Sequence, residues 1–209
     1  MILKKTLLKK PGLYLVTDNS VLEGKDLFNI LSCSLKAGLD MVQFRDKEAS
    51  DRGFLETGFK IKELLKHKAI FIINDRVHAA LALDADGVHL GPQDMPVATA
   101  RKILGRKKII GFSASSLKEA MDAQKQAVDY IAIGAIFKTP VKPGYKIAGL
   151  ETLKQVVNMI KIPLVAIGGV NESNIKEIRA VGVRRIAVVR AILEAENPYL
   201  ATKSLLGKI

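Results

Sequence analysis

The sequence alternates between short β-branched runs and stretches in which apolar residues recur at helical spacing. Residues 54–65, for example, carry their apolar side chains at the spacing of one helix face. The runs are almost continuously apolar, which is typical of parallel strands covered by helices. Eight runs predict strands, at 13–17, 41–45, 70–74, 87–90, 109–113, 130–134, 163–168 and 185–189.

Eight evenly spaced strand–helix units in 209 residues predict a single-domain α/β chain, a (β/α)8 TIM barrel over residues 1–209. A doubly wound open sheet is the alternative, and the even spacing favours closure. In a closed barrel the carboxyl ends of all strands meet at one face. Polar residues that follow different strands are therefore expected to line one pocket.

Composition excludes several classes of protein. Hydrophobic residues make up 48% of the chain, which argues against intrinsic disorder. No apolar run approaches the roughly 20 residues that cross a bilayer, so no membrane partner is expected. A single cysteine, Cys33, excludes an internal disulfide framework and favours a cytoplasmic location.

The net charge is +12, but the basic residues are scattered and the chain has no tryptophan. The chain has few aromatic side chains on which nucleic-acid bases could stack, so no nucleic-acid partner is expected. The charge suits steering of anionic small-molecule substrates. A homo-oligomer is compatible with the sequence.

Gln43, Arg45 and Lys47 stand at alternate positions at the end of the second run. On an extended backbone their side chains point to the same side. An amide, a guanidinium and an ammonium group together can hold a diphosphate. The competing interpretation is a polar strand end with solvated charges.

Asn74 and Asp75 follow the third run, and Asp94 lies in the turn-rich loop after the fourth. Two carboxylates from neighbouring strand-end loops, completed by substrate oxygens and water, suit Mg2+. The ion would neutralise a diphosphate and help it to leave. Either aspartate could instead cap a helix, and this alternative competes most strongly at Asp94.

Further anion-binding groups are expected after the last three strands. Gly168 and Gly169 end the seventh run, where barrels often bind phosphate through backbone N–H groups. Val189 ends the eighth run, Arg190 follows it, and both join this candidate site. A proline-bounded loop after the sixth run carries Thr139 and Lys142, and its composition fits a hinged lid over an anion.

The three histidines carry little weight in this interpretation. His67 lies in a polar turn, His78 in a helical stretch and His89 within the short fourth run. None has the spacing of a helical zinc pair, so no zinc site is predicted. No serine lies in a nucleophile elbow, so covalent serine catalysis is not predicted.

Seven motifs, in order from Tyr14 to about Ile192, resemble those of the thiamine-phosphate synthase family. They are Gln43-x-Arg45-x-Lys47, Ile73-Asn74-Asp75-Arg76, Gly87-Val88-His89-Leu90-Gly91, Asp94-Met95-Pro96, Gly111-x-Ser113, Thr139-Pro140-x-Lys142-Pro143 and Ala166-Ile167-Gly168-Gly169. The resemblance implies a (β/α)8 fold and a Mg2+-assisted transferase of thiamine biosynthesis. Such an enzyme joins a hydroxymethylpyrimidine diphosphate to a hydroxyethylthiazole phosphate and releases diphosphate.

The resemblance also implies a role for each candidate residue. Gln43, Arg45, Lys47, Asn74, Ser113 and Lys142 would bind the pyrimidine diphosphate, Asp75 and Asp94 would hold Mg2+, and Thr139, Gly169, Val189 and Arg190 would surround the thiazole phosphate. The implied catalytic residues are Arg45, Lys47, Lys142 and Ser113. We expect Lys142→Ala to lower the condensation rate by about 10²-fold or more, as for the loss of one preorganised electrostatic contact.

Two positions depart from the family pattern. Val141 replaces a hydroxyl residue of the sixth loop, and Arg190 replaces a serine after the eighth strand. Arg190 either supplies a charged phosphate contact in place of the missing hydroxyls or crowds the pocket and changes the thiazole that is accepted.

Two other functions compete with the synthase. A related thiazole tautomerase shares the barrel, but it typically carries a histidine just after Ser113, where this chain has Ala114. A non-catalytic barrel that senses a phosphorylated ligand is the second alternative, and the retention of Asp75 and Asp94 argues against it.

Overall fold

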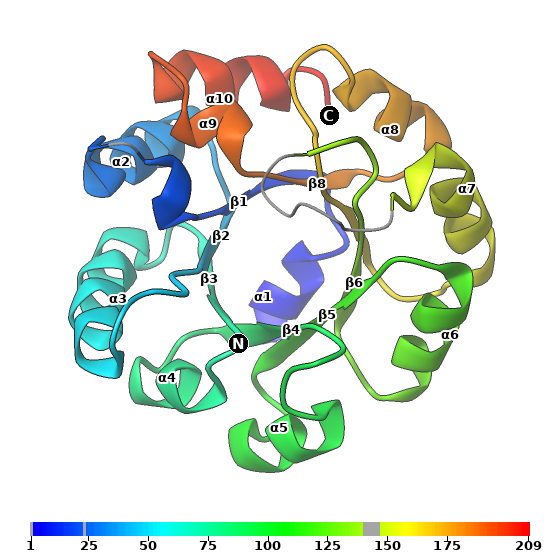
Figure 1. The fold of residues 1–209 in the computed structure, drawn as a ribbon, viewed down its shortest axis with the longest axis horizontal. Helices are drawn as coiled ribbons and strands as arrows, with labels where there is room; N and C mark the ends of the chain where they lie inside the picture. The colour runs from blue at the N-terminus through cyan, green and yellow to red at the C-terminus, as the bar shows by residue number, and fades with distance from the viewer. Residues whose placement is uncertain (1, 23, 140–146) are drawn as a thin grey trace.

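The computed structural model describes residues 2–22, 24–139 and 147–209. Its parallel strands β1 to β8 close into a barrel, because β8 pairs with β1 as well as with β7. Figure 1 views this barrel along its axis, with the helices around it. The predicted (β/α)8 fold is confirmed, and the open doubly wound sheet is wrong.

The strands lie close to the predicted runs. They are β1 (Gly12–Val16), β2 (Met41–Phe44), β3 (Ile70–Asn74), β4 (Gly87–Leu90), β5 (Ile109–Ala114), β6 (Tyr130–Ile133), β7 (Leu164–Ala166) and β8 (Arg185–Val188). The largest difference is β7, which is shorter at both ends than the predicted run 163–168. It cannot extend to Gly168, whose φ of 101° is incompatible with a strand.

Apart from α1, which precedes β1, the helices of the described residues follow the strands along the chain. They are α1 (Ile2–Leu7), the 3-10 turn η1 (Asn19–Val21), α2 (Leu27–Ala37), α3 (Asp51–Leu65), α4 (Val77–Ala82), α5 (Val97–Leu104), α6 (Leu117–Lys125), α7 (Gly149–Met159), α8 (Ile175–Val181), α9 (Arg190–Leu193) and α10 (Pro198–Leu206). Side-chain caps begin several of them. Asp26 accepts from Phe28 N at the start of α2, and Ser50 accepts from Gly53 N at the start of α3.

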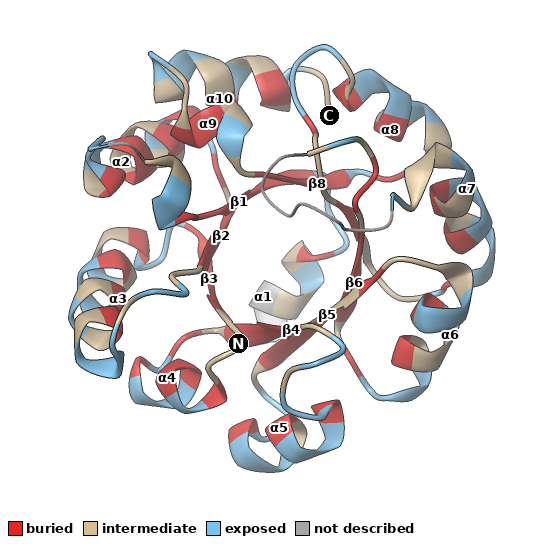
Figure 2. Ribbon diagram, in the orientation of Figure 1, coloured by how far each residue is buried: buried red, intermediate tan, exposed pale blue. Residues whose placement is uncertain are grey.

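Burial divides the core into two parts. The larger cluster fills the layer between the outer face of the barrel and the inner faces of the helices. A smaller cluster fills the barrel itself, with Tyr14, Met41, Ile72 and Tyr130 among its members. Figure 2 shows the buried residues along the strands and on the helix faces turned toward them. The barrel is therefore a packed core below its carboxyl-end opening.

Helix α1 lies across the amino-end opening, where Figure 1 shows it through the barrel. The Arg185 side chain, 1% exposed, forms an ion pair with Asp40 through two contacts of 2.8 and 2.9 Å. It also donates to the carbonyl oxygens of Leu7 and Lys10. This guanidinium joins β8 to the residue before β2, to the end of α1 and to the segment after α1. Ligand access is thereby left to the carboxyl end.

None of the helices in the described part of the chain is both long and apolar enough to cross a bilayer.

Candidate active site

A cavity of about 640 Å3 opens at the carboxyl ends of the strands. Gln43, Arg45, Asn74 and Ser113 line it from β2, β3 and β5. The strand order places β2 and β3 across the barrel from β6 and β7. From the second side come predicted phosphate-site residues of strands β6 to β8: Thr139, Gly168, Gly169, Val189 and Arg190. The structure therefore brings together most of the residues predicted from the sequence.

Some predicted residues are not among those that line the cavity. Lys47, Asp75 and Asp94 lie in the segments that follow β2, β3 and β4, but outside the lining. Lys142 lies outside the described residues, as does Val141. The structure thus locates the two proposed metal ligands at strand ends beside the cavity rather than on its wall.

Arg45 is held in place at the end of β2. Its backbone N–H donates to the Thr17 hydroxyl over 2.9 Å, and that hydroxyl donates to the Arg45 carbonyl over 3.1 Å. The guanidinium forms an ion pair with the buried Asp18. Asp18 also accepts from the backbone and hydroxyl groups of Ser20, which fixes the carboxylate. Arg45 is therefore an oriented cation and not a freely solvated one, so the solvated-charge interpretation is wrong for this residue.

Lys47 lies beyond the end of β2 and forms an ion pair with Asp75 from the next strand. The Asn74 amide donates to the same carboxylate oxygen over 2.8 Å. The φ angle of Asp75 is 49°, which lies in the left-handed region of backbone conformation. A residue other than glycine adopts this region at a cost in free energy. The contacts with Lys47 and Asn74 hold the Asp75 carboxylate in place just after β3.

Neither candidate metal ligand caps a helix. The N-cap residue of α4 is Arg76 and that of α5 is Pro96, and neither helix has a side-chain cap hydrogen bond. Asp94 instead accepts from Gly91 N over 2.6 Å and closes its own loop. The capping alternative is therefore wrong at both Asp75 and Asp94.

The donor set at these two residues fits a divalent cation. Each carboxylate uses only its Oδ2 atom in the hydrogen bonds and ion pairs seen among the described residues, so its Oδ1 atom is available there. Within that same part of the chain, no group of three or more His, Cys, Asp or Glu side chains could hold a metal. Substrate and water oxygens would therefore have to complete the coordination of an ion held by Asp75 and Asp94, as is usual for Mg2+.

Gly168 and Gly169 form a tight turn against the segment that follows β6. A Cβ on Gly168 would lie 2.6 Å from the Cα of Ala135, and one on Gly169 would lie 2.5 Å from the carbonyl oxygen of Lys138. Both positions require glycine, since their φ angles are 101° and 65°. Among the described residues, neither backbone N–H group has a hydrogen-bond acceptor. Two backbone donors at the cavity wall suit an anion.

Arg190 lies at the cavity wall at the start of α9. Its Nε atom lies 2.5 Å from Oε1 of Glu194, one helical turn later, and Glu194 lines the cavity as well. The ion pair with Glu194 holds the Arg190 guanidinium in place through its Nε atom. Arg190 is half-exposed at this wall rather than filling the interior of the barrel.

The sequence reasoning missed three buried polar residues at the base of the cavity, and Tyr14 and His89 belong to its lining. Tyr14, His89 and Tyr130 lie inside the barrel, and their polar atoms connect to Gln43 and Ser113. Burial raises the pKa of the Tyr14 phenol, and burial followed by the charge of Tyr14 raises the pKa of Tyr130 well above its ordinary value. Both phenols therefore stay protonated at neutral pH.

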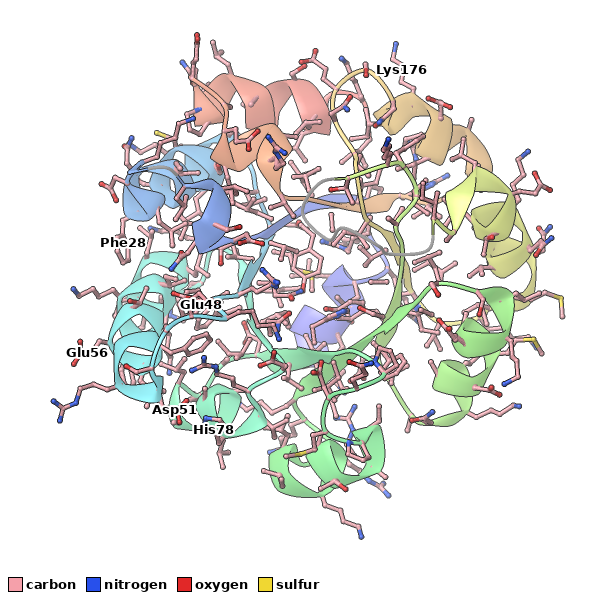
Figure 3. All side chains as sticks on the ribbon, viewed as in Figure 1. Phe28, Glu48, Asp51, Glu56, His78 and Lys176 are labelled. Atoms are coloured by element: carbon pink, nitrogen blue, oxygen red, sulfur yellow. The ribbon has the colours of Figure 1, made fainter. Side chains whose placement is uncertain are left out.

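Strand alternation contains the signal that would have found His89. It follows the inward-facing Gly87 by two residues, as Ser113 follows Gly111. His78, in contrast, lies on the outside beside Asp51, where Figure 3 shows both labelled side chains at the rim. His67 is exposed as well.

Comparison with known proteins agrees with this geometry. Residues 13–192 match the family model described as thiamine monophosphate synthase. The chain belongs to this family. A thiamine-phosphate synthase of Methanobrevibacter smithii is 46% identical over 93% of both chains. One of Nostoc punctiforme is 44% identical over 97% of this chain, which spans only 57% of that longer protein.

A solved structure of the same family has the same fold. It is a thiamine phosphate pyrophosphorylase from Pyrococcus furiosus, 39% identical, with a TM-score of 0.88 over 97% of this chain and 96% of that one. Family membership favours the synthase interpretation over the tautomerase and over a non-catalytic barrel.

Proposed function

We propose that this chain is a thiamine-phosphate synthase that joins a pyrimidinylmethyl diphosphate to a hydroxyethylthiazole phosphate and releases diphosphate. The observation that carries the proposal is a single cavity lined by anion-binding groups from separate strand ends. Arg45 follows β2, whereas Gly168 and Gly169 follow β7 and Arg190 follows β8, and all four line the same cavity. Two phosphorylated substrates can then meet with their reactive centres between the two anions.

On the donor side, Gln43, Arg45, Asn74 and Ser113 would bind the pyrimidine diphosphate. Arg45 is oriented by Asp18 and Thr17, so its binding to diphosphate costs little reorganisation. Lys47 adds a second cation beside this wall. Lys142 is proposed as a further cation on the strength of the family resemblance.

Asp75 and Asp94 would hold Mg2+ at the ends of β3 and β4. The bound ion would supply charge neutralisation to the leaving diphosphate. Lys47 now pairs with the Asp75 carboxylate, so binding of the diphosphate and ion would let this ammonium turn to a phosphate oxygen.

In the reaction the carbon–oxygen bond of the pyrimidinylmethyl diphosphate breaks, and the bonding electrons leave with the diphosphate oxygen. The aminopyrimidine ring delocalises the resulting cation, and the thiazole nitrogen donates its lone pair to the methylene carbon. This nitrogen carries no proton, so the step needs no general base. Catalysis then rests on positioning and on stabilisation of the departing charge.

On the acceptor side, Gly169, Val189, Arg190 and Thr139 would surround the thiazole phosphate. The N–H groups of Gly168 and Gly169 supply neutral donors, and Arg190 supplies the only formal cation that we assign to this subsite. We propose that Arg190 replaces the hydroxyl contacts of the family with a charged contact to phosphate.

The test is an assay with the purified chain, both phosphorylated substrates and Mg2+, followed by chromatographic detection of thiamine phosphate. We expect product only when both substrates are present. A folded protein that isomerises the thiazole phosphate alone would support the tautomerase alternative. Binding of both ligands without chemistry would support the sensing barrel.

A further inference from the structure

A chain of hydrogen bonds runs through the barrel interior at the base of the cavity, and all of its members except Tyr130 line that cavity. Gln43 Nε2 donates to the Tyr14 hydroxyl over 2.7 Å, and that hydroxyl lies 2.9 Å from the hydroxyl of Tyr130. His89 Nδ1 lies 2.9 Å from the Tyr130 hydroxyl. His89 Nε2 lies 2.8 Å from Ser113 Oγ, which opens onto the cavity. Five side chains from β1, β2, β4, β5 and β6 are thus linked in series.

The orientation of the Gln43 amide sets the direction of this chain. Its nitrogen can only donate, so the Tyr14 oxygen accepts, and the Tyr14 proton is left for Tyr130. Gln43 and Tyr130 are the hydrogen-bond partners of the Tyr14 hydroxyl among the described residues, and Tyr14 is 1% exposed. A proton pointing elsewhere would be buried without an acceptor, which costs about 1–3 kcal/mol.

The same logic continues to the cavity. Tyr130 accepts from Tyr14 and therefore donates to His89 Nδ1. A neutral imidazole whose Nδ1 accepts carries its proton on Nε2, which then donates to Ser113 Oγ. The Ser113 proton has no acceptor among the described residues and is directed into the cavity.

We propose that Tyr130 and His89 are positioning residues, which fix the Ser113 hydroxyl as a hydrogen-bond donor to the bound diphosphate. The inference rests on the proposed function, because a diphosphate oxygen can only accept. If the hydrogen bonds ran in the opposite direction, the Ser113 hydroxyl would donate its proton to His89 Nε2. It would then present only lone pairs to the anion, and the contact would be repulsive.

The direction also determines what the His89–Ser113 pair cannot do. A histidine that activates a serine nucleophile accepts the hydroxyl proton. Here Nε2 is the donor, so His89 does not deprotonate Ser113. The pair serves charge stabilisation and not covalent catalysis.

The barrel interior is shaped to hold Tyr130 in this place. A Cβ on Gly111 would lie 2.1 Å from Tyr130 Cζ, so the phenol occupies space that only glycine leaves on β5. The His89 ring stacks on the Tyr130 ring, with centroids 5.5 Å apart and planes inclined by 27°. Ring position and hydroxyl direction are therefore fixed together.

The first arm of the test measures the His89 tautomer in the unmodified protein by 15N NMR of the imidazole nitrogens. The chain has three histidines, so His67→Gln and His78→Gln variants, both at exposed positions, assign the remaining signals. We expect His89 to carry its proton on Nε2. A proton on Nδ1 would overturn the proposal without any assay of activity.

The second arm is kinetic and uses Tyr130→Phe, which keeps the ring and removes the hydroxyl. We expect kcat to fall on the order of ten-fold, as for one hydrogen bond to a charged group, with an unchanged KM for the thiazole phosphate. The matched control Tyr199→Phe, at a position 38% exposed on α10, keeps the wild-type kcat.

A double variant shows whether the effect passes through Ser113. In a Ser113→Ala background, Tyr130→Phe should lower kcat no further. Independent, multiplying losses would refute a positioning role. If the unmodified protein forms no thiamine phosphate, the proposed function fails, while the tautomer still decides the direction of the chain. If Tyr130→Phe does not fold, the same tautomer measurement remains decisive.

Discussion

The cationic side chains of this site are oriented by carboxylates that do not themselves need to touch a substrate. Asp18 fixes Arg45, and Glu194 fixes Arg190 through its Nε atom. An oriented guanidinium loses less conformational entropy on binding phosphate than a solvated one. The same device thus serves both sides of the cavity.

Arg190→Ser tests the acceptor side. Because the variant loses a charged contact, we expect KM for the thiazole phosphate to rise about ten-fold, while the dephosphorylated thiazole is affected little. The measurement compares KM for the two acceptors in both proteins. Arg106→Ser, which removes an exposed arginine elsewhere, is the control. An unchanged preference for the phosphorylated acceptor would defeat the assignment.

Asp94→Asn tests the metal side. An amide keeps one oxygen but loses the negative charge, so the Mg2+ concentration for half-maximal activity should rise about ten-fold or more. Calorimetric titration of Mg2+ in the presence of diphosphate checks the affinity independently. Asp122→Asn, on the exposed face of α6, should leave both values unchanged. Equal Mg2+ dependence in Asp94→Asn and the wild type would remove Asp94 from the metal site.

At the scale of elements, the amino end of the barrel depends on one buried cation. Arg185 joins β8 to Asp40 before β2 and to the carbonyl groups of Leu7, at the end of α1, and Lys10. Its Nε atom is buried without a partner among the described residues, which is a cost that the other contacts offset. This end is remote from the cavity.

Arg185→Met should therefore destabilise the fold and spare the chemistry. Removing one partner of a buried ion pair leaves the Asp40 carboxylate uncompensated and costs about 3–5 kcal/mol. Urea denaturation measures the free energy of unfolding, and steady-state assays measure KM for both substrates. Asp40→Leu combined with Arg185→Met should recover part of the loss. A single variant as stable as wild type would contradict this role of Arg185.

The helices and strands could be predicted where the residues that determine them are close together in the sequence. Strands β3 and β4 coincide with the predicted runs because each is bounded by polar or turn-forming residues. Contacts between strands were not predictable. Arg45 meets Asp18, and His89 meets Tyr130, through barrel closure and register rather than through spacing along the chain. The sequence therefore offered no reason to select His89 within its short apolar run, because its contact with Tyr130 depends on the fold.

At the scale of the whole molecule, two phenols inside the barrel couple stability to pH. Burial raises the pKa of Tyr14 and Tyr130 above the ordinary value of 10.0 in the folded state. Above pH of about 10 the unfolded chain loses phenolic protons that the folded chain keeps. The stabilising contribution is therefore complete below that pH and is lost as the pH rises.

Tyr14→Phe isolates this contribution. Above the pKa of the unfolded state, each buried phenol lowers the free energy of unfolding by up to about 1.4 kcal/mol per pH unit. The variant should therefore show a shallower fall of the free energy of unfolding with pH than wild type. Urea denaturation between about pH 9 and pH 11 measures it. Tyr199→Phe is the matched control at an exposed position. Identical slopes in all three proteins would show that the buried phenols do not control alkaline stability.

The most direct test of the proposed condensation is the stoichiometry of the two products in one reaction. The purified chain is incubated with the pyrimidine diphosphate, the thiazole phosphate and Mg2+, and thiamine phosphate and diphosphate are quantified together over time. The proposed reaction predicts equal amounts of both at every time point and neither product when the thiazole phosphate is omitted. Diphosphate release without thiamine phosphate, or no product from the folded protein, would contradict it.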